Sequence, residues 1–569
     1  MAVGARVAGL GRRVQRGWER YRPRGRPFFT PWTVATLVAV ALVLLPLVSI
    51  FIGVFGESSA TWEHLASTVL WDYLRNSALL VLGVGLATLL VGVTTAWLVT
   101  TCDFPGRKIF EWALILPLSV PTYIMAYTYA ELFAHAGPVQ GALQVVFDPA
   151  TTAGLRSALM SLPGAGLMMA LVLYPYVYLI TRTSFLKQSG GVLETSRILG
   201  KSPWATFFRV ALPMARPGVV AGVTLVLMEV LNEYGAVTYF GVSTFTTGIF
   251  RAWFSLGDGP AAIRLSGCLL LFVFVLILME RAQRGRARFD DGPRGSRPVV
   301  RFELSGGRRW AAFTACALPV FFGFLLPVLQ LGAWAVQVAP EAVDLRFLGL
   351  AANSFGLALV AALLTVFVGL LIVYSVRLSP TPFLKLAARA SSLGYSIPGA
   401  VIAVGVLVPF IWLDRQASRL LQTTMGFSPG LILTGTVTAL VFAYVVRFLA
   451  VSLNPVESGF ERTCGNLDET SRSLGAPPLK TLVKVDIPLL RGTLISAGLL
   501  VFVDVLKELP LTLILRPFDF DTLATRAFQL AMDEQVARSA LPALLIIGTG
   551  MLPVIGLSRL ISLIGRKRI

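Results

Sequence analysis

The chain has 569 residues, of which 55% are hydrophobic and only 14% are charged, and its mean hydropathy is +0.74. This composition excludes an ordinary soluble domain and predicts an integral membrane protein. The formal net charge of +19 would suit a nucleic-acid partner, but the basic residues gather in segments that flank apolar runs. Because that distribution is the one that orients membrane proteins, no nucleic-acid partner is expected.

The chain begins with a basic segment, residues 1–30, which is predicted to lie in the cytoplasm. The apolar run that follows is too long for a typical cleaved signal peptide, so we interpret it as the first membrane span. The first half of the protein is predicted to cover residues 31–282. A spanning helix needs about 20 apolar residues, and this half contains six such runs, near 31–55, 73–99, 109–134, 165–186, 211–240 and 262–281.

A linker rich in Arg, Gly and Pro, residues 283–309, separates this half from a second one, residues 310–569. Because bases exceed acids in the N-terminal segment, in the linker and at the end of the chain, both termini are predicted to be cytoplasmic. The runs are far longer than the strands of a membrane barrel, so the predicted fold class is all-α with about twelve transmembrane helices. The six runs of the second half lie near 310–335, 350–376, 388–413, 430–454, 491–515 and 540–564.

A seven-residue sequence occurs twice, each time between the fourth and fifth runs of a half, and so on the cytoplasmic side. Residues 194–200 read ETSRILG, and residues 469–475, which lie 275 positions later, read ETSRSLG. The same register continues into the fifth runs, and an offset of 277 relates the third runs. The chain is therefore two fused homologous halves of six spans each. By itself, the repeat could also mark ordinary connecting loops inherited by duplication.

Both copies of the repeat predict a short helix that ends at a glycine. Gly200 and Gly475 suit the left-handed conformation that closes a helix. In the first copy Ser202 can cap a second helix, of which Pro203 would be the first residue. The second copy has two prolines, residues 477–478, at these positions. The same helix-turn-helix is therefore expected twice.

The second helix of the first copy is expected to carry an apolar face formed by Trp204, Phe207 and Phe208, beside the basic Lys201 and Arg209. Such a face can lie against the membrane or fit a groove on a partner protein. The sequence contains no G-x-x-x-x-G-K-[ST] motif. The chain is therefore not expected to be an enzyme or to hydrolyse ATP by a phosphate-binding loop of its own.

Four acidic residues occupy equivalent places in the fifth runs of the two halves: Glu229, Glu233, Asp504 and Glu508. At about 1.5 Å per residue they are expected in the middle to outer part of the span. A charge there is costly in lipid and is expected to face a wet interior, so these residues are predicted to line a path or a gate. They could instead form ion pairs, for example with Lys507, because charges inside membranes commonly pair.

The repeat resembles the EAA loop of ABC importer permeases, which has a Glu, an intervening Arg, a Gly and a later Pro. Thr and Ser stand here where that family usually has two alanines, so the side chains remain small. The resemblance implies the type I importer permease fold and a coupling loop that sits in a cleft of an ATPase subunit. The matching positions, which would couple the ATPase to the pathway, are Glu194, Arg197, Gly200, Glu469, Arg472 and Gly475.

Two further stretches, residues 232–253 and 507–526, resemble the fused two-domain permeases of bacterial ferric-iron importers. That resemblance implies one copy of this chain in the inner membrane, two copies of an ABC ATPase that bind ATP and Mg, and one extracytoplasmic ferric-binding protein. Fe(III) would be the transported substrate, and no cofactor of the chain itself is implied. Because oxygen ligands suit a hard trivalent cation, Glu233 and Glu508 are candidate metal ligands.

Two alternatives fit the same sequence. The first is an ABC importer permease for another substrate, such as thiamine, a polyamine or an oxyanion. The second is an ion-driven secondary transporter built from parallel repeats, in which the intramembrane carboxylates would be proton or sodium sites. Transport by such a protein would survive the loss of any ATPase but would collapse with the ion gradient.

Overall fold

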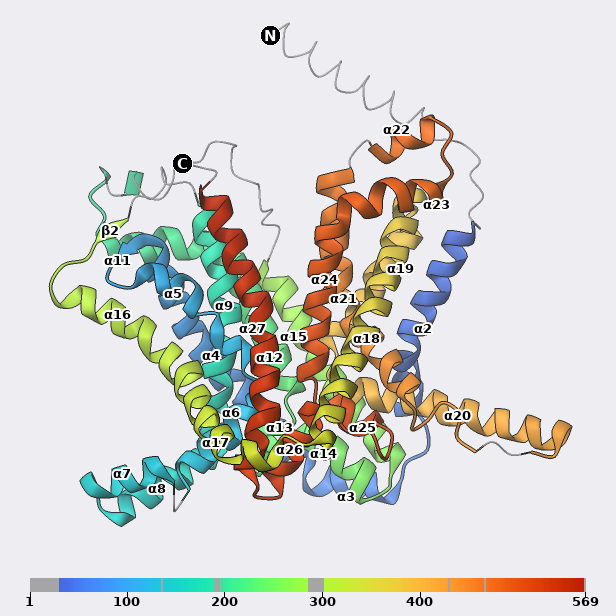
Figure 1. Cartoon of the computed structure of the whole chain (residues 1–569), viewed down its shortest axis with the longest axis horizontal. Coiled ribbons are helices and arrows are strands. Elements are labelled where there is room, and N and C mark those ends of the chain that lie inside the picture. Colours follow the sequence, from blue (N-terminus) through green and yellow to red (C-terminus); the bar gives the residue numbers. More distant parts are fainter. Residues whose placement is uncertain are drawn as a thin grey trace, which may run out of the picture.

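The computed structural model describes residues 30–134, 137–188, 195–196, 198–284, 301–427, 430–464 and 467–566. The long helices lie side by side in one bundle (Figure 1). In this part of the chain, eleven helices are long and apolar enough to cross a membrane, and a bent pair of helices brings the number to twelve. The predicted all-α membrane fold with about twelve spans is confirmed.

The long helices follow the apolar runs of the sequence. In the first half they are α2 (Pro31–Val54), α4 (Leu70–Thr101), the bent pair of α5 (Arg107–Ala113) with η1 (Leu116–Ser119) and α6 (Thr122–Leu132), α9 (Leu162–Lys187), α12 (Leu212–Asn232) and α15 (Gly259–Arg284). In the second half they are α16 (Gly307–Val320) continued by η4 (Phe321–Leu325) and α17 (Leu326–Ala342), α18 (Leu345–Leu378), α20 (Gly399–Met425), α21 (Val437–Gly459), α24 (Ile487–Lys507) and α27 (Val536–Arg566).

Short elements connect the spans at the two ends of the bundle. The end that carries the repeated sequence, which we call the loop end, lies at the top of Figure 1 and includes α11 (Pro203–Thr206), α22 (Leu467–Ser473) and α23 (Pro478–Thr481). The opposite end, which we call the far end, includes α3 (Ala60–Thr68), α7 (Pro138–Val146), α8 (Pro149–Leu159) and α14 (Phe245–Phe250). At the loop end a parallel pair, β1 (Cys102–Asp103) and β2 (Phe302–Glu303), attaches the last part of the linker to the first half.

The third run of each half is broken at a proline, which corrects the continuous spans predicted at 109–134 and 388–413. Val120 and Ile397 are extended because each precedes a proline, Pro121 or Pro398. In the first half the helices on the two sides of this break meet at 90°. In the second half the break separates α19 (Pro382–Ser391) and η5 (Ser392–Ser396) from α20.

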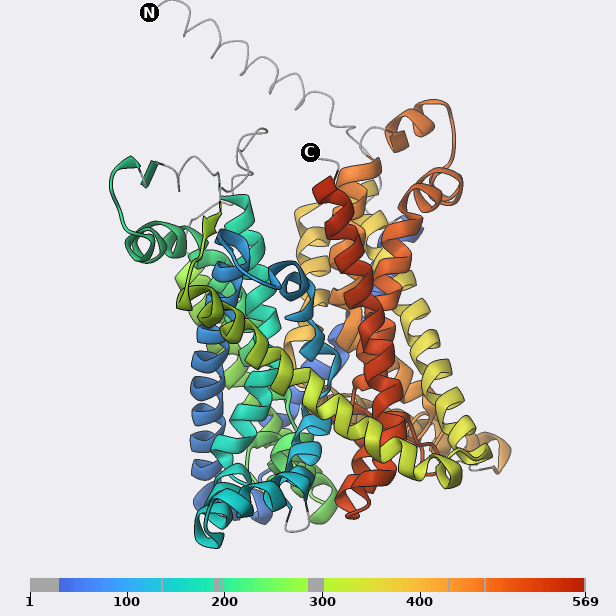
Figure 2. The same ribbon diagram turned by 60° about the vertical axis from the view of Figure 1, so that its left-hand side comes forward.

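The two halves exchange their first helices. α2 packs against α18, α19 and α20 of the second half, and α16 and α17 pack against α4, α5 and α6 of the first half. In Figure 2 the yellow-green α16 and α17 run obliquely across the first-half helices towards the base of α27. Helix α2 approaches α20 closely at Gly405, whose carbonyl oxygen accepts a hydrogen bond of 2.6 Å from the Ser49 hydroxyl.

Replacing Gly405 with alanine should therefore loosen the contact between the halves. An added Cβ would lie 2.5 Å from the carbonyl oxygen of Pro46, and a backbone atom can shift only at a considerable cost in energy. We expect a loss of about 1–3 kcal/mol in stability, measured as a lower unfolding temperature of the purified protein. The matched control is Gly83→Ala in α4, where a Cβ would meet nothing within 4 Å. Equal stability of the two variants would contradict the close contact.

Candidate functional site

Both copies of the repeated sequence form the same glycine turn at the loop end. Gly200 has a φ of +73° and Gly475 a φ of +84°, values that residues with a side chain rarely adopt. In the second copy the backbone N–H of Leu474 donates to the carbonyl oxygen of Thr470 at 3.1 Å, so a helical turn precedes the glycine. The glycine-closed turn predicted from the sequence is confirmed in both halves.

A matching pair of hydroxyl groups ties each turn to the helix that follows it. Ser196 and Thr206 are linked by a hydrogen bond of 3.0 Å in the first half, and Ser471 and Thr481 by one of 3.0 Å in the second. These residues occupy the same positions in the repeat. The identical ties hold the two loops in the same shape, although neither was recognised in the sequence.

The helix after each turn is the beginning of the fifth span. The predicted cap is present in the first copy, where Ser202 Oγ accepts from the N–H of Ala205 at 3.3 Å. Beyond it, α11 continues through a π-helical turn, η2 (Phe207–Ala211), into α12, and α23 continues through η7 (Leu482–Asp486) into α24. The separate short helix expected from the sequence is therefore one end of a helix that extends from the loop into the middle of the bundle.

Exposed apolar side chains recur at equivalent positions of the two loops. In the first loop, for example, Trp204 is 74% exposed, and in the second loop Leu474 is 84% exposed. An exposed basic residue, Arg209 or Lys484, accompanies each group. We call these groups the loop patches: the first consists of Leu199, Trp204, Phe208 and Arg209, and the second, at an offset of 275, of Leu474, Leu479, Val483 and Lys484.

Phe207 does not belong to the exposed face that the sequence predicted. Its ring is buried against Trp97 of α4, with the ring centroids 4.9 Å apart. Trp204 and Phe208 alone remain at the surface, with their rings stacked at 6.1 Å. Phe207 therefore anchors the start of the fifth span to the second span.

The other residues predicted to couple an ATPase lie only partly within the described structure. Glu194 and Arg197 lie outside the described residues. Glu469 lies in α22, but its side chain is outside the described part. Arg472 lies in the last turn of α22 and is half-buried. Their role in coupling remains a prediction.

The four acidic residues lie where the fifth spans end. α12 ends at Asn232 and α24 at Lys507, and the next residue of each half, Glu233 or Glu508, is extended. Each of these carboxylates accepts a hydrogen bond from the helix that follows: Glu233 from the N–H of Ala236 at 2.8 Å, and Glu508 from that of Leu511 at 3.3 Å. The spans predicted at 211–240 and 491–515 are thus both broken at a carboxylate.

The two halves hold these equivalent carboxylates by different means. In the first half the hydroxyl of Thr122 donates to Glu233. In the second half the guanidinium of Arg447 pairs with Glu508 at 3.2 Å, and both side chains are buried. Gly399 occupies the position equivalent to Thr122, and a Cβ there would lie 2.6 Å from Glu508 Oε1. The glycine therefore leaves room for the ion pair.

The other two acids, Glu229 and Asp504, also have different partners in the two halves. Asp504 pairs with Lys507 at 2.8 Å, which is one of the ion pairs that the sequence left open. Glu229 accepts a hydrogen bond from the Tyr395 hydroxyl at 3.4 Å. Beside it, the side-chain oxygen of Asn232 accepts from the N–H of Gly399 at 2.7 Å. The last two bonds join the first half to the second.

A cavity of about 90 Å³ lies between the halves at this level. Three carboxylates line it, Glu229, Glu233 and Glu508, together with the amine of Lys507. The buried hydroxyl of Tyr123 also belongs to the lining and has no hydrogen-bond partner among the described residues. In that part of the chain no group of three or more His, Cys, Asp or Glu residues could hold a metal ion. The cavity is rich in oxygen atoms, and a metal-binding role of Glu233 and Glu508 stays a prediction.

Residues 89–288 match the family described as the inner membrane component of binding-protein-dependent transport systems. The chain therefore carries the permease domain of such a system. The permease is 24% identical over 538 residues to the Fe(3+)-transport system permease protein FbpB 2 of Haemophilus influenzae, covering 94% of this chain and 98% of the relative.

Two shorter relatives match the permease over about a third of its length. The sulfate transport system permease protein CysW of Escherichia coli K12 is 28% identical over 211 residues, which is 36% of this chain and 68% of the relative. The molybdenum transport system permease protein ModB of Haemophilus influenzae is 29% identical over 192 residues, which is 33% of this chain and 81% of the relative. Similarity alone therefore leaves the substrate of the permease open.

Sequence reasoning missed two arginines that organise the permease. Arg447 stands alone in the apolar run of the fourth span, which was a signal that it needs a buried partner. Arg377 of α18 binds Asp468 of α22 through two hydrogen bonds of 2.7 and 2.9 Å. One turn earlier in α18, the hydroxyl of Tyr374 donates to the carbonyl oxygen of Pro478 at 2.7 Å. These contacts anchor the second loop to the second span of its half.

Proposed function

We propose that the chain forms the transmembrane pathway of an ATP-driven importer for ferric iron, the iron being delivered by an extracytoplasmic binding protein. Two copies of a separate ATPase subunit would bind at the loop patches, and one copy of this chain would serve each complex. ATP and Mg would be bound by those subunits and Fe(III) would be the cargo. The supporting observation is that both loop patches connect through single helices to one acidic cavity.

The connection is mechanical. Each fifth span is continuous from its loop to its acidic end, over Trp204–Asn232 in the first half and Pro478–Lys507 in the second. A helix of that length spans about 45 Å at 1.5 Å per residue. Closure of the ATPase pair on ATP would bring the loop patches together and move the acidic ends of α12 and α24 as rigid bodies. Hydrolysis would then return the cavity to its inward-facing state.

The charge of the cavity favours a cation as cargo. Three lining carboxylates face one lining amine, that of Lys507. Lys507 pairs with Asp504 and Arg447 pairs with Glu508, so the carboxylates of Glu229 and Glu233 remain as excess negative charge among the described residues. A sulfate or molybdate ion would be repelled by such a lining, whereas a hard trivalent cation prefers oxygen ligands. The relative that matches over almost the whole chain is the Fe(3+) permease. Both observations support iron over an oxyanion.

The proposed orientation follows from charge. The segments with excess Lys and Arg are 1–30, the linker 283–309 and the end of the chain, so these and the loop end would face the cytoplasm of a bacterial inner membrane. The far end would face the binding protein. In this scheme the permease halves are residues 31–282 and 310–569. The repeat, which resembles an EAA loop, would supply Glu194, Arg197, Glu469 and Arg472 to the ATPase contact.

The proposal is tested by transport. Proteoliposomes holding the permease with its copurifying ATPase should take up radiolabelled iron from a binding protein only when ATP is inside with the ATPase. Sulfate, molybdate, thiamine and polyamines serve as competing cargo in parallel assays. Uptake of one of these instead of iron would overturn the substrate, and uptake that follows an ion gradient without ATP would establish a secondary transporter.

Replacing both Glu229 and Glu233 with glutamine should weaken iron transport without preventing assembly. These two carboxylates have no basic hydrogen-bonding partner in the described structure. A contact with a charged group contributes about 1.5–3 kcal/mol, so the half-saturating iron concentration should rise about tenfold or more. The control is Glu63→Gln, an exposed carboxylate of α3. Unaltered iron uptake would remove Glu229 and Glu233 from the pathway.

A further inference from the structure

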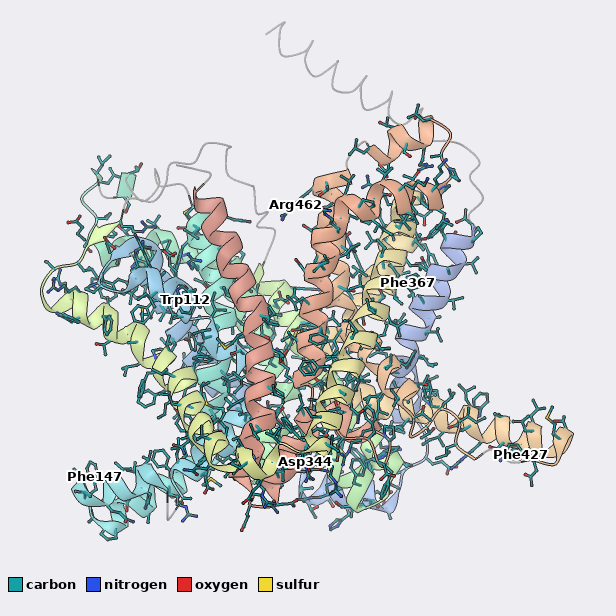
Figure 3. All side chains as sticks on the ribbon, viewed as in Figure 1. Trp112, Phe147, Asp344, Phe367, Phe427 and Arg462 are labelled. Carbon is teal, nitrogen blue, oxygen red and sulfur yellow. The ribbon has the colours of Figure 1, made fainter. Side chains whose placement is uncertain are left out.

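Each half sends out an arm between its third and fourth spans, at the far end of the bundle. The first arm consists of α7 and α8, and the second of α20 from Ile411 onward with the described return residues 430–436. Figure 1 shows the arms leaving opposite sides of the bundle and running across the direction of the spans. Phe147 and Phe427 mark their outer ends in Figure 3. The run predictions at 109–134 and 388–413 did not foresee these projections.

The second arm is amphipathic. Leu413, Ala417, Leu420 and Leu421 follow one another at helical spacing and form one stripe, while Arg415, Arg419 and Gln422 occupy the opposite face. Leu420 is 63% exposed. The apolar character continues past the helix, where the side chains of Phe427, Leu431 and Ile432 are exposed as well.

Internal hydrogen bonds hold this arm in a fixed shape. The carboxylate of Asp414 accepts from the backbone N–H groups of Ile432, Leu433 and Thr434 at 2.8–3.1 Å. The hydroxyl of Ser418 donates to the carbonyl oxygen of Gly430 at 2.9 Å. These hydrogen bonds hold the return segment along α20, so the exposed apolar side chains lie on an arm of defined shape.

The first arm has the same character with different residues. Val145 is 86% exposed, and its neighbours Val146 and Phe147 are exposed too. The carboxylate of Asp148 caps α8 by accepting from the N–H groups of Ala150 and Thr151, each at 3.1 Å. The arms thus share exposed apolar tips and fixed local geometry, although their sequences and helix lengths differ.

We propose that both arms lie flat in the interfacial layer of the lipid leaflet at the far end. Helices that run in the plane of a membrane place an apolar stripe among the acyl chains and basic residues at the phosphate level. The second arm provides that combination in its leucine stripe and its two arginines. The span α2, which packs against α20, also exposes apolar side chains, among them Val48, Phe51 and Ile52. A lipid surface covers all of these side chains at once.

The arms would then fix the depth and tilt of the bundle in the membrane. They leave the bundle on opposite sides, so a tilt towards either side would pull one arm out of its layer. This inference concerns the membrane contact alone and does not depend on the cargo proposed above.

Site-directed spin labelling in nanodiscs of phosphatidylcholine and phosphatidylglycerol tests the proposal. In a variant with the four native cysteines replaced, nitroxides would be attached at Leu420→Cys and Val145→Cys, with Gln422→Cys and Gln144→Cys as matched controls on the same helices. All four positions are exposed, so the label does not disturb packing. At 420 and 145 we expect a several-fold higher ratio of oxygen to nickel-chelate collisions than at 422 and 144.

Two results would overturn the inference. The first is a ratio typical of water at positions 420 and 145 in nanodiscs. The second is shielding of these positions that develops only when the extracytoplasmic binding protein is added, because it would show that the arms are a protein-docking surface. Size-exclusion elution of each labelled variant at the volume of the unlabelled protein confirms that the full chain is assembled.

Discussion

Replacing Gly200 and Gly475 together with valine should abolish coupling to an ATPase. Both glycines have a positive φ, and a Cβ at either position would meet nothing within 4 Å, so the cost comes from the backbone conformation alone. That cost is about 1–2 kcal/mol per residue and is greater for a β-branched side chain. The turns should open, and the loop patches should no longer be presented in the same way. We expect ATP-driven uptake to fall more than tenfold and the copurifying ATPase to be largely lost.

The control for this experiment is asparagine at the same two positions. Asparagine tolerates the left-handed conformation better than other residues with a side chain, so the Asn variants should keep most of the associated ATPase. Because the space around each glycine is open, a difference between valine and asparagine would report on backbone geometry and not on bulk. ATPase binding and ATP-dependent uptake that survive the valine substitutions would count against the loop patches as the coupling surface.

Replacing Arg447 with methionine should cause the largest loss of stability of any single substitution considered for this protein. The variant leaves the buried carboxylate of Glu508 without its cationic partner, since the ion pair of 3.2 Å is the contact between these two side chains. Breaking a buried pair by removing one member costs about 3–5 kcal/mol. We expect a much lower unfolding temperature, measured on the purified protein in detergent and in nanodiscs.

The double variant Arg447→Met with Glu508→Gln should recover most of that loss. A buried ion pair replaced by neutral groups of similar size is often neutral in stability, because the cost of burying the charges disappears with them. The amide oxygen of glutamine can still accept from the N–H of Leu511. Arg75→Ala is the comparison, because Arg75 pairs with Asp72 at the surface, where such a pair contributes about 0–1 kcal/mol. A single Arg447 variant as stable as the Arg75 variant would show that the buried pair does not stabilise the second half.

The asymmetry of the carboxylate region has a consequence for transport. Glu508 and Asp504 of the second half are each paired with a basic residue, whereas Glu229 and Glu233 of the first half are held by hydroxyl and backbone groups. If the cavity receives a cation, the first half would offer it the freer carboxylates. The second half would have to break ion pairs to do so. The two halves share the same acidic positions but differ at the equivalent positions Thr122 and Gly399.

Much of this protein is determined by local sequence patterns. The apolar runs are long enough to span a membrane and contain few charges, so the number of helices follows from their lengths. The repeat at 194–200 and 469–475 has a constant register, and its glycines require a positive φ wherever the chain is placed. The acidic residues of the fifth spans could be predicted for the same reason, because a charged residue within an apolar run is recognised from the sequence without knowledge of its tertiary contacts.

The tertiary structure alone decided which residues meet. Arg447 and Glu508 lie on different spans, and neither shows in its own segment that the other is its partner. Phe207 was predicted to lie on an exposed face, but Trp97 of another helix covers it. Helix α2 was assigned to the first half, which it begins, although it packs against α18, α19 and α20 of the second half. Spacing along a helix fixes the direction of a side chain relative to its own axis. The packing of one helix on another, which depends on close approaches such as that of Gly405 to Pro46, decides what that side chain touches.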